Sequence, residues 1–518
     1  RRLRPLIPFV CPEWHEIKVN YVKNKNAEKP VQVCLLGVQK HPYLTNFPLT
    51  FLATAQRSFQ ALQAKAIQNL RANSHLGSSA FFNLVLPHCF LRSISQDSRL
   101  RIFDSITVFW AWIWQILEGN ASCHRALTLI QAWRAHLCLP EISSDTSSYC
   151  SARQRLKLDF LLAIHRRILH HLEPRIHEAS QWRGFNLKAM DGSSIQLMDT
   201  PENQALYPQP NQQKKGCGFP VMGFVGLVNL SHGAWEHLET CPHTQFDSVG
   251  GQALIQHVKR GDILLADRAF CTYQLISQAL QSGAQVVMRL HQARSKVIDM
   301  RKWKFLGNGD CEMLWKRPSF RQKGEESQRL RNSLPESLKI RIIHTRAKNR
   351  EGKWIDYYIA TTLLDPLIYK AAEIVELYMK RWDIELKIRD FKTTLRLEQM
   401  EVKTPEMAKK SLWVSVIAHN LLRVLMNESA KQANLPVRDL SFKGALNLLL
   451  SMRSHAHKRG AKVLKDLLSY MASKVVHRRP GRQEPRAVKR RPKPFQLLTK
   501  PRGIFVEVYH RKKYRKQA

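Results

Sequence analysis

The chain has 518 residues, and its 82 lysines and arginines outnumber its 41 aspartates and glutamates, giving a formal net charge of +41. This excess of positive charge is far more than solubility requires and predicts a polyanionic partner. The 12 tryptophans and 21 phenylalanines indicate a large buried core, which argues against short basic proteins such as histones and ribosomal proteins.

No segment of the sequence is suited to crossing a membrane. The most apolar stretch, Ile106–Leu117 (ITVFWAWIWQIL), is much shorter than the roughly 20 residues that a membrane helix needs, so it predicts a buried core helix. Residues Arg1–Val10 carry no recognisable secretion signal. The ten cysteines form no C-x-x-C pair, which is typical of reduced thiols. We therefore expect a cytoplasmic protein without membrane contacts.

The N-terminal third divides into two parts. Residues up to about 75 show no sustained periodicity, whereas those from about 80 to 180 have helical spacing and predict an all-helical domain. Candidate caps of its helices are Ser95 or Asp97, Asn120, and Ser147 or Ser148. Segments 121–137 and 148–172 are a candidate DNA-binding helix pair, although most helix pairs are merely packed. Three histidines are expected to be solvated or to face the helix dipole rather than to bind metal: His165, His170 and His171.

The pattern changes to strands alternating with helices between residues 184 and 290, which predicts an α/β layer. The strand candidates are residues 185–190, 195–198, 220–230, 262–266 and 284–290, and the helix candidates are residues 248–258 and 271–282. Asp191 and Asp267 each follow a strand candidate, so both are expected at the carboxyl ends of strands, where α/β sheets place their chemistry.

A basic, turn-rich stretch follows, and its strand candidates 338–345 and 354–363 predict an inserted β-rich subdomain. Helical spacing returns at residues 367–392, 405–428 and 440–452. The tail from Lys474 to Ala518 is rich in Lys, Arg and Pro, which predicts phosphate contacts that do not depend on nucleotide sequence.

Four polar residues of the helix predicted at 367–392 share one face. On a helical wheel, Tyr378, Arg381, Glu385 and Lys392 fall within about 60°, beside an apolar stripe that anchors the helix. Taken alone, this pattern is equally typical of a solvated face with an Arg381–Glu385 ion pair. Together with Asp191 and Asp267, however, Glu385 completes a set of three carboxylates suited to two Mg²⁺ ions and to phosphodiester cleavage.

Three stretches of the sequence resemble a known family. The spacing Y-x2-R-x3-E-x6-K in YMKRWDIELKIRDFK resembles the YREK signature of DDE transposases from bacterial insertion sequences. The stretches KAMDGSSIQLMDTPENQALYPQP and GDILLADRAF resemble the two motifs that carry the first and second aspartates of that family. The resemblance extends over roughly residues 80–510, including the tail text RRPKPFQLLTKPR.

The resemblance implies a DNA transposase with a ribonuclease-H-like catalytic core. Asp191, Asp267 and Glu385 would then be the catalytic and metal-binding triad, with two Mg²⁺ ions for which Mn²⁺ can substitute. Tyr378, Arg381, Lys392 and Arg268 would contact phosphates at the transposon end. The implied partners are terminal inverted repeats, target DNA and a second copy of the chain in a synaptic complex, and the implied location is the bacterial nucleoid.

This interpretation divides the chain into six parts. They are an N-terminal extension (1–75), a helical DNA-binding domain (76–180), the first part of the core with both aspartates (181–295), a β-rich insertion (296–365), the second part of the core with the YREK helix (366–428), and a helical C-terminal region with a basic tail (429–518).

Two alternatives stay open at the level of sequence. One is a related DDE nuclease that cleaves DNA without strand transfer, and the other is a domesticated DNA-binding protein that no longer cuts. If cleavage proceeds through a hairpin, a tryptophan of the insertion has to stack a flipped base, and the candidates are Trp303, Trp315 and Trp354. An aromatic core role is favoured for each of the three, because a turn-rich β subdomain needs core aromatics.

Overall fold

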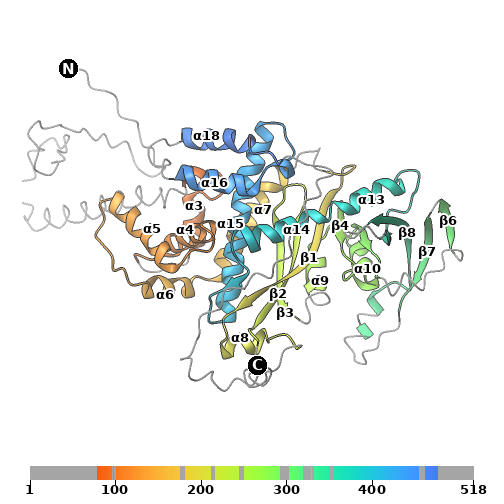
Figure 1. Ribbon diagram of the computed structural model, residues 1–518, viewed down its shortest axis with the longest axis horizontal. Helices are drawn as coiled ribbons and strands as arrows, with labels where there is room; N and C mark the ends of the chain where they lie inside the picture. The colour runs from red at the N-terminus through yellow and green to blue at the C-terminus, as the bar shows by residue number, and fades with distance from the viewer. Residues whose placement is uncertain are drawn as a thin grey trace, which may run out of the picture. The chain divides into compact units, whose positions relative to one another are not determined.

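The computed structural model describes most of the chain between residues 79 and 476 (Figure 1). The described residues are 79–95, 97, 101–175, 181–211, 216, 218–243, 250–291, 303–307, 309–318, 328–329, 332–348, 354–453 and 461–476. The extension predicted at 1–75 and all of the basic tail beyond Val476 lie outside them.

The region from Ser79 to Leu172 is helical, as predicted. Its helices are α2 (Ser79–Phe82), α3 (His88–Ile94), α4 (Ser105–Leu117), α5 (Cys123–His136), α6 (Ser147–Arg155) and α7 (Leu158–Leu172). Every residue of α4 from Ile106 to Leu117 is buried, which confirms the predicted core helix. Among the described residues, no helix is both long enough and apolar enough to span a bilayer.

The predicted helix caps were wrong in detail. The cap of α4 is Asp104, whose carboxylate accepts from the Thr107 amide, and the cap of α5 is Ser122 rather than Asn120. Asn120 instead ends the preceding helix: its φ is +54°, and its N–H donates to the Ile116 carbonyl. The predicted run 148–172 is also two helices, because Leu156 and Lys157 have extended backbone angles.

The strands of the described residues form one mixed sheet in the order β3-β2-β1-β4-β5-β9-β8-β7-β6, with β10 paired to β1. Their bounds are β1 (Asn186–Leu197), β2 (Val221–Asn229), β3 (Trp235–Pro242), β4 (Asp262–Ala266), β5 (Gln285–Arg289), β6 (Lys304–Gly307), β7 (Asp310–Lys316), β8 (Ser337–Lys348), β9 (Trp354–Thr361) and β10 (Gln399–Met400). Strands β1, β4 and β5 are mutually parallel, and β2 and β3 continue the sheet antiparallel. The strands of the predicted insertion join this sheet because β9 pairs with β5.

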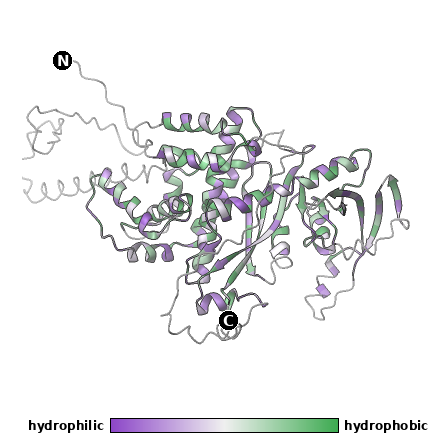
Figure 2. Ribbon diagram, in the orientation of Figure 1, coloured by the Kyte–Doolittle hydropathy of each residue, from purple (hydrophilic) through white to green (hydrophobic). Residues whose placement is uncertain are grey.

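Helices cover both faces of the sheet. One face packs against the C-terminal helices α13 (Ala371–Met379), α14 (Trp382–Arg389) and α15 (Pro405–Gln432), and the other packs against α9 (Gly251–Ile255) and α10 (Tyr273–Gln281). The remaining helices are α8 (Pro201–Leu206), α16 (Phe442–Met452) and α18 (Ala461–Ala472). Helices α16 and α18 carry hydrophobic and hydrophilic residues in alternation (Figure 2), as expected for helices with one buried face.

Successive residues of β1 belong to different cores. Leu187 and Ala189 lie in the core beneath α13, α14 and α15, whereas Met190 lies in the core beneath α9 and α10. This alternation follows from the two-residue period of a strand. It determines which side chains of each strand can reach the C-terminal helices.

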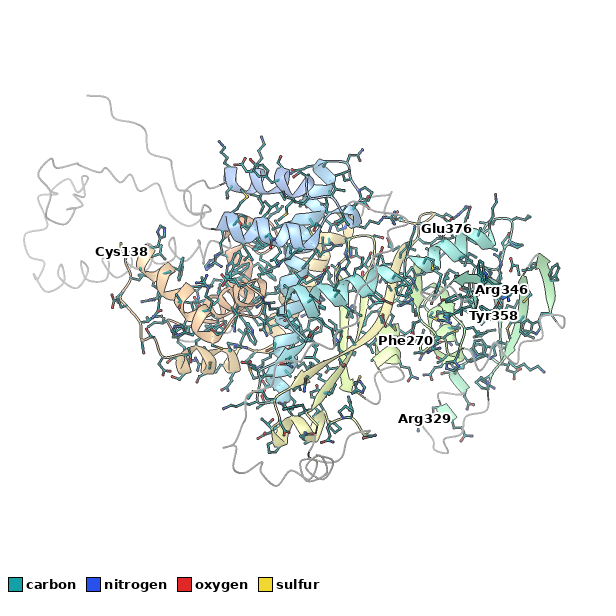
Figure 3. All side chains as sticks on the ribbon, in the orientation of Figure 1. Cys138, Phe270, Arg329, Arg346, Tyr358 and Glu376 are labelled. Carbon is teal, nitrogen blue, oxygen red and sulfur yellow. The ribbon has the colours of Figure 1, made fainter. Side chains whose placement is uncertain are left out.

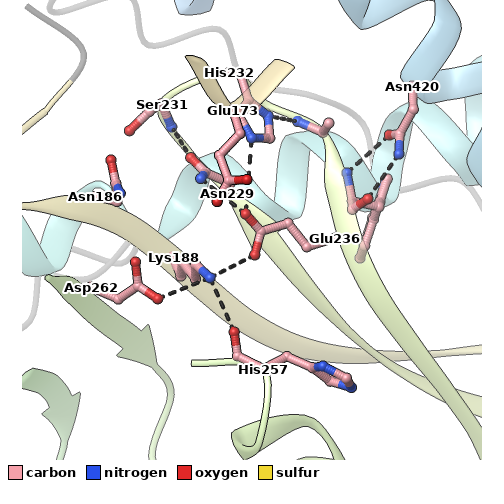
Figure 4. Close-up of polar contacts among 12 residues, drawn as sticks. Glu173, Asn186, Lys188, Asn229, Ser231, His232, Glu236, His257, Asp262 and Asn420 are labelled. Carbon is pink, nitrogen blue, oxygen red and sulfur yellow. Dashed lines mark hydrogen bonds and ion pairs between the residues drawn. The ribbon is translucent and has the colours of Figure 1, made fainter. Parts of the chain in front are cut away.

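A buried ion network ties β1 to its neighbours on the α9 side of the sheet (Figure 4). The Lys188 ammonium lies 2.8 Å from Glu236 of β3 and 2.9 Å from Asp262 of β4, and it donates to the His257 carbonyl at 3.1 Å. Burial opposes the charge of Lys188, but Glu236 and Asp262 outweigh this effect and raise its pKa. All three protons of the ammonium are therefore used inside the protein.

His165 is buried, which corrects the expectation that it is solvated. Its side chain is 2% exposed, and its Nε2 lies 3.0 Å from the Trp235 carbonyl oxygen. Burial lowers the pKa of His165 to about 4. The helix register explains the error, because His165 lies on the same face as the core residues Leu161, Ile164 and Ile168.

We predict that Lys188→Met lowers the free energy of unfolding by about 3–5 kcal/mol, because Glu236 and Asp262 would stay buried without a cation. Urea denaturation measures this change. The matched control is Lys259→Met, which removes a lysine that is 61% exposed and should change stability by less than about 1 kcal/mol. Equal effects of the two substitutions would contradict the role assigned to the network.

We also predict that His165 makes the protein less stable at mildly acidic pH. The folded-state pKa lies below the unfolded value, so the unfolded chain binds the extra proton and stability falls as pH drops below about 6.5. The contribution is roughly 2 kcal/mol between pH 7 and pH 5. His165→Gln should flatten this part of the stability profile, whereas His170→Gln, at an exposed position of the same helix, should leave its slope unchanged.

Candidate active site

Three residues form a row across the parallel strands β1, β4 and β5. Met190 pairs with Ala266, and Ala266 pairs with Met288, so the residues that follow them stand at one level: Asp191, Asp267 and Arg289. Neighbouring strands are about 4.8 Å apart, which makes the three residues close neighbours. Each lies two positions after a residue of the core beneath α13, α14 and α15, namely Ala189, Leu265 and Val287. All three side chains therefore face the C-terminal helices.

Asp191 lies inside a strand and not at its end, which corrects the prediction. The strand candidates 185–190 and 195–198 are one continuous strand, β1, which also pairs with β2 through Asp191 and Gly226. Of the two aspartates, only Asp267 follows the end of a strand, because Ala266 is the last residue of β4. The backbone of Asp191 thus pairs with Gly226 of β2 on one side, whereas its pairing with β4 on the other side stops one residue earlier, at Met190.

Both aspartate side chains are fixed by local backbone hydrogen bonds. One oxygen of Asp191 accepts from the Gly192 N–H at 2.8 Å, and one oxygen of Asp267 accepts from the Ala269 N–H at 2.8 Å. The second interaction is an Asx turn, which a short carboxylate makes two residues along the chain. These bonds leave the other oxygen of each carboxylate available for further partners.

The helix predicted at 367–392 is interrupted in two places. Helix α13 ends at Met379 and α14 begins at Trp382, and the N–H groups of Lys380 and Arg381 donate to carbonyls three residues back, which makes a tighter turn. From Asp390 to Thr394 the chain forms a π-helix that contains Lys392. A wheel of 100° per residue therefore does not hold from Tyr378 to Lys392.

Arg381 joins the helix to the sheet. Its side chain is buried, with one terminal nitrogen 3.6 Å from Asp191 and the other 3.3 Å from Glu385. Burial opposes the Arg381 charge, but Tyr378 and Asp191 outweigh this and raise the pKa of the guanidinium. The expected i, i+4 pair with Glu385 is present, and the additional contact with Asp191 brings two of the three candidate carboxylates onto one cation.

The electrostatics of Asp191 and Tyr378 link the remaining residues to this centre. Burial raises the pKa of Asp191 to about 6, with Asp267 and Glu385 adding to the rise. Burial likewise raises the pKa of Tyr378, against the effects of Arg381 and Arg289 and together with that of Asp267. The row on the sheet and the residues of α13 and α14 therefore act on one another.

The donor chemistry of this centre suits a hard divalent cation. Among the residues that the structure describes, no three carboxylate, histidine or cysteine side chains are close enough to form a ready-made metal site. The Arg381 guanidinium occupies the space between Asp191 and Glu385. However, the candidate ligands are all carboxylates, which is the donor set that Mg²⁺ and Mn²⁺ prefer.

The other predicted site residues lie in varied surroundings. Arg268 is exposed in the turn after Asp267, and Lys392 is partly buried in the π-helix. Trp303 and Trp315 pack against the core beneath α10, in agreement with a structural role, whereas Trp354 is 62% exposed at the start of β9.

Analysis of the sequence missed two residues near this centre, Arg289 and Tyr357. The Arg289 guanidinium carbon lies 4.4 Å from the centre of the Tyr357 ring. The signal for Arg289 was its place near the end of the strand predicted at 284–290, but only the register shows that it stands beside Asp267.

The chain is similar to known transposases. Residues 182–421, which include all three carboxylates, match a family model described as a transposase DDE domain. The chain is 24% identical over 431 residues to transposase InsG for insertion sequence element IS4 of Escherichia coli (strain K12), covering 79% of this chain and 90% of that protein. Among solved structures, it is similar to a piggyBac transposase synaptic complex with hairpin DNA, with a TM-score of 0.39 and 10% identity over 79% of this chain and 86% of that chain.

Proposed function

The chain belongs to the DDE transposases related to that of insertion sequence IS4, and from this premise we propose that Asp191, Asp267 and Glu385 are its catalytic carboxylates. As a DNA transposase it cuts and joins DNA. We propose that it cleaves at the ends of its element and transfers the freed 3′-hydroxyl into target DNA, in cut-and-paste transposition. One observation carries this proposal: the sheet register sets Asp191 beside Asp267, and Arg381 ties Asp191 to Glu385.

The three carboxylates would hold two divalent cations, Mg²⁺ or Mn²⁺, through their oxygens. When bound, these ions supply charge stabilisation to the attacking and leaving oxygens of a phosphodiester. The sheet contributes Asp191 and Asp267 on fixed backbone, and α14 contributes Glu385, which is the more exposed ligand with 43% of its side chain accessible. Two ligands fixed on the sheet and one exposed ligand on a helix suit a site that DNA must reach from the solvent.

Arg381 has a second role in this proposal. Its guanidinium now neutralises Asp191 and Glu385, and cations bound by these carboxylates would take over that task. The freed guanidinium is then placed to hold a DNA phosphate, since its planar donors match phosphate geometry. Tyr378, Lys392 and Arg268 would contact neighbouring phosphates of the transposon end.

The arrangement of the sheet supports a ribonuclease-H-like core. Its strands β3, β2, β1, β4 and β5 lie in that spatial order, with β2 antiparallel to β1 and with β4 and β5 parallel to it. In this proposal the two catalytic aspartates come from β1, the central strand of these five, and from the residue that follows β4 beside it. We propose the same six-part division of the chain that the sequence suggests, with residues 76–180 as a helical DNA-binding region. We also propose that two copies of the chain pair two transposon ends.

We predict that Asp191→Asn, Asp267→Asn and Glu385→Gln each reduce cleavage of transposon-end DNA at least about a thousandfold while binding of the same DNA is retained. The assay uses a labelled duplex with the terminal inverted repeat, a supercoiled target plasmid and Mg²⁺, and it follows nicked and joined products. The matched control is Glu376→Gln, an exposed carboxylate of α13 (Figure 3), which should cleave like the wild type.

Two outcomes would overturn parts of this proposal. Cleavage at the wild-type rate by Glu385→Gln would remove Glu385 from the metal site. A wild-type protein that nicks the ends but never joins them to the plasmid would identify a nuclease rather than an enzyme of strand transfer.

A further inference from the structure

Arg289 ends β5 at the level of the two aspartates. Its backbone is held by the sheet, because the preceding residue, Met288, pairs with Ala266 of β4 and Arg289 itself pairs with Ile359 of β9. In the row across the sheet it stands next to Asp267, on the side away from Asp191. Its side chain is only partly buried, so it faces the C-terminal helices without being enclosed by them.

An aromatic ring supports the Arg289 guanidinium. Tyr357 lies two residues before Ile359 in β9, so both side chains are on the face to which Arg289 points. The guanidinium carbon is 4.4 Å from the centre of the Tyr357 ring, within the range of a cation–π contact. The ring covers one face of the guanidinium and leaves the N–H donors at its edge directed elsewhere.

Among the described residues, Arg289 makes no ion pair, in contrast to other arginines of the same sheet and site. Arg341 pairs with Asp310 at 2.5 Å, Arg346 with Asp356 at 2.9 Å, and Arg381 with Asp191 and Glu385. A half-buried arginine that is held by an aromatic ring, with its donors not used on a carboxylate, suits a ligand that brings its own negative charge.

The charge of Arg289 also reaches the proposed active site. It opposes the rise in the pKa of Tyr378 that burial causes, as Arg381 does. Helix α13, which carries Tyr378, packs directly on β5. Arg289 and Arg381 therefore both act on Tyr378.

We propose that Arg289, supported by Tyr357, binds a backbone phosphate of the transposon-end DNA, on the side of Asp267 that faces the insertion strands. The proposal rests on the proposed function, because it assigns a further DNA contact to the same site. The strands β9 and β8, which carry Tyr358 and Arg346 (Figure 3), continue the sheet on that side of Asp267.

The first test measures the affinity for a duplex with the terminal inverted repeat as a function of salt, in protein that carries Glu385→Gln so that no cleavage occurs. Arg289→Ala should weaken binding roughly 10-fold to 100-fold and reduce the slope of log K against log salt by about one, because one phosphate contact is lost. Arg289→Lys should restore most of the slope, and the matched control Arg346→Ala, whose arginine is already paired, should keep the wild-type slope.

The second test identifies the phosphate. Single phosphates of the duplex are replaced by neutral methylphosphonates, and each effect is compared between the parent protein and Arg289→Ala. At one position near the cleavage site the replacement should weaken binding of the parent and have no further effect in Arg289→Ala, because the two changes remove the same contact. Tyr357→Phe should behave like the parent, since it keeps the ring, and Tyr357→Ala should lose part of the effect.

The proposal is wrong if every methylphosphonate weakens binding by the same factor in Arg289→Ala as in the parent protein. It is also wrong if Arg289→Ala melts at the same temperature as the parent and keeps the same salt slope. Either result would leave the proposed function intact. Parent protein that does not bind the end duplex would overturn both.

Discussion

The parallel pairing of β1, β4 and β5 is the constraint on which the candidate site depends. Strand pairing in one register sets Asp191, Asp267 and Arg289 side by side, and a shift of one residue in any of the three strands would turn its side chain to the opposite face. The strand register therefore determines whether these three side chains meet. The exposed carboxylate, Glu385, comes from a helix that the Arg381 guanidinium fastens to this row.

Both faces of β1 contribute to that constraint. On the α9 side, the buried ammonium of Lys188 connects β1 to β3 and β4 through Glu236 and Asp262. Three residues further along the same strand, and on the opposite face, Asp191 points to the C-terminal helices. Burying charges costs desolvation free energy, so the network adds little net stability. A strand register that separated Lys188 from Glu236 and Asp262 would, however, leave buried charges without partners and be strongly destabilised.

Much of the fold could be predicted from local patterns in the sequence, while the arrangement of the site could not. The strand at 262–266 was predicted with the bounds that β4 has, and the core helix at 106–117 was recognised because that stretch is the most apolar of the sequence. Asp191 was expected at a strand end because one strand candidate stopped at residue 190 and the next began at residue 195, yet pairing with β2 carries a single strand through Gly192, Ser193 and Ser194. Tertiary pairing overrode local propensity there.

The remaining differences have the same origin. The tight turn between α13 and α14 and the π-helix after α14 cannot be seen in the spacing of apolar residues. Each changes the spacing of the backbone hydrogen bonds by only one residue relative to an α-helix. Arg289 was overlooked because its neighbours in space, Asp267 and Tyr357, are far from it in sequence. Residue types thus indicated the candidate carboxylates, while only the register reveals which other groups surround them.

The central claim is that Asp191, Asp267 and Glu385 together bind divalent cations on this sheet. The most direct test is a crystal structure of the protein bound to transposon-end DNA and Mn²⁺, in which anomalous scattering locates the ions. The account predicts anomalous peaks bonded to oxygens of all three carboxylates, at roughly 2.1 Å as for Mg²⁺, with the Arg381 guanidinium displaced toward a phosphate. Peaks elsewhere, or Arg381 still lying between Asp191 and Glu385 with no peak beside it, would contradict it.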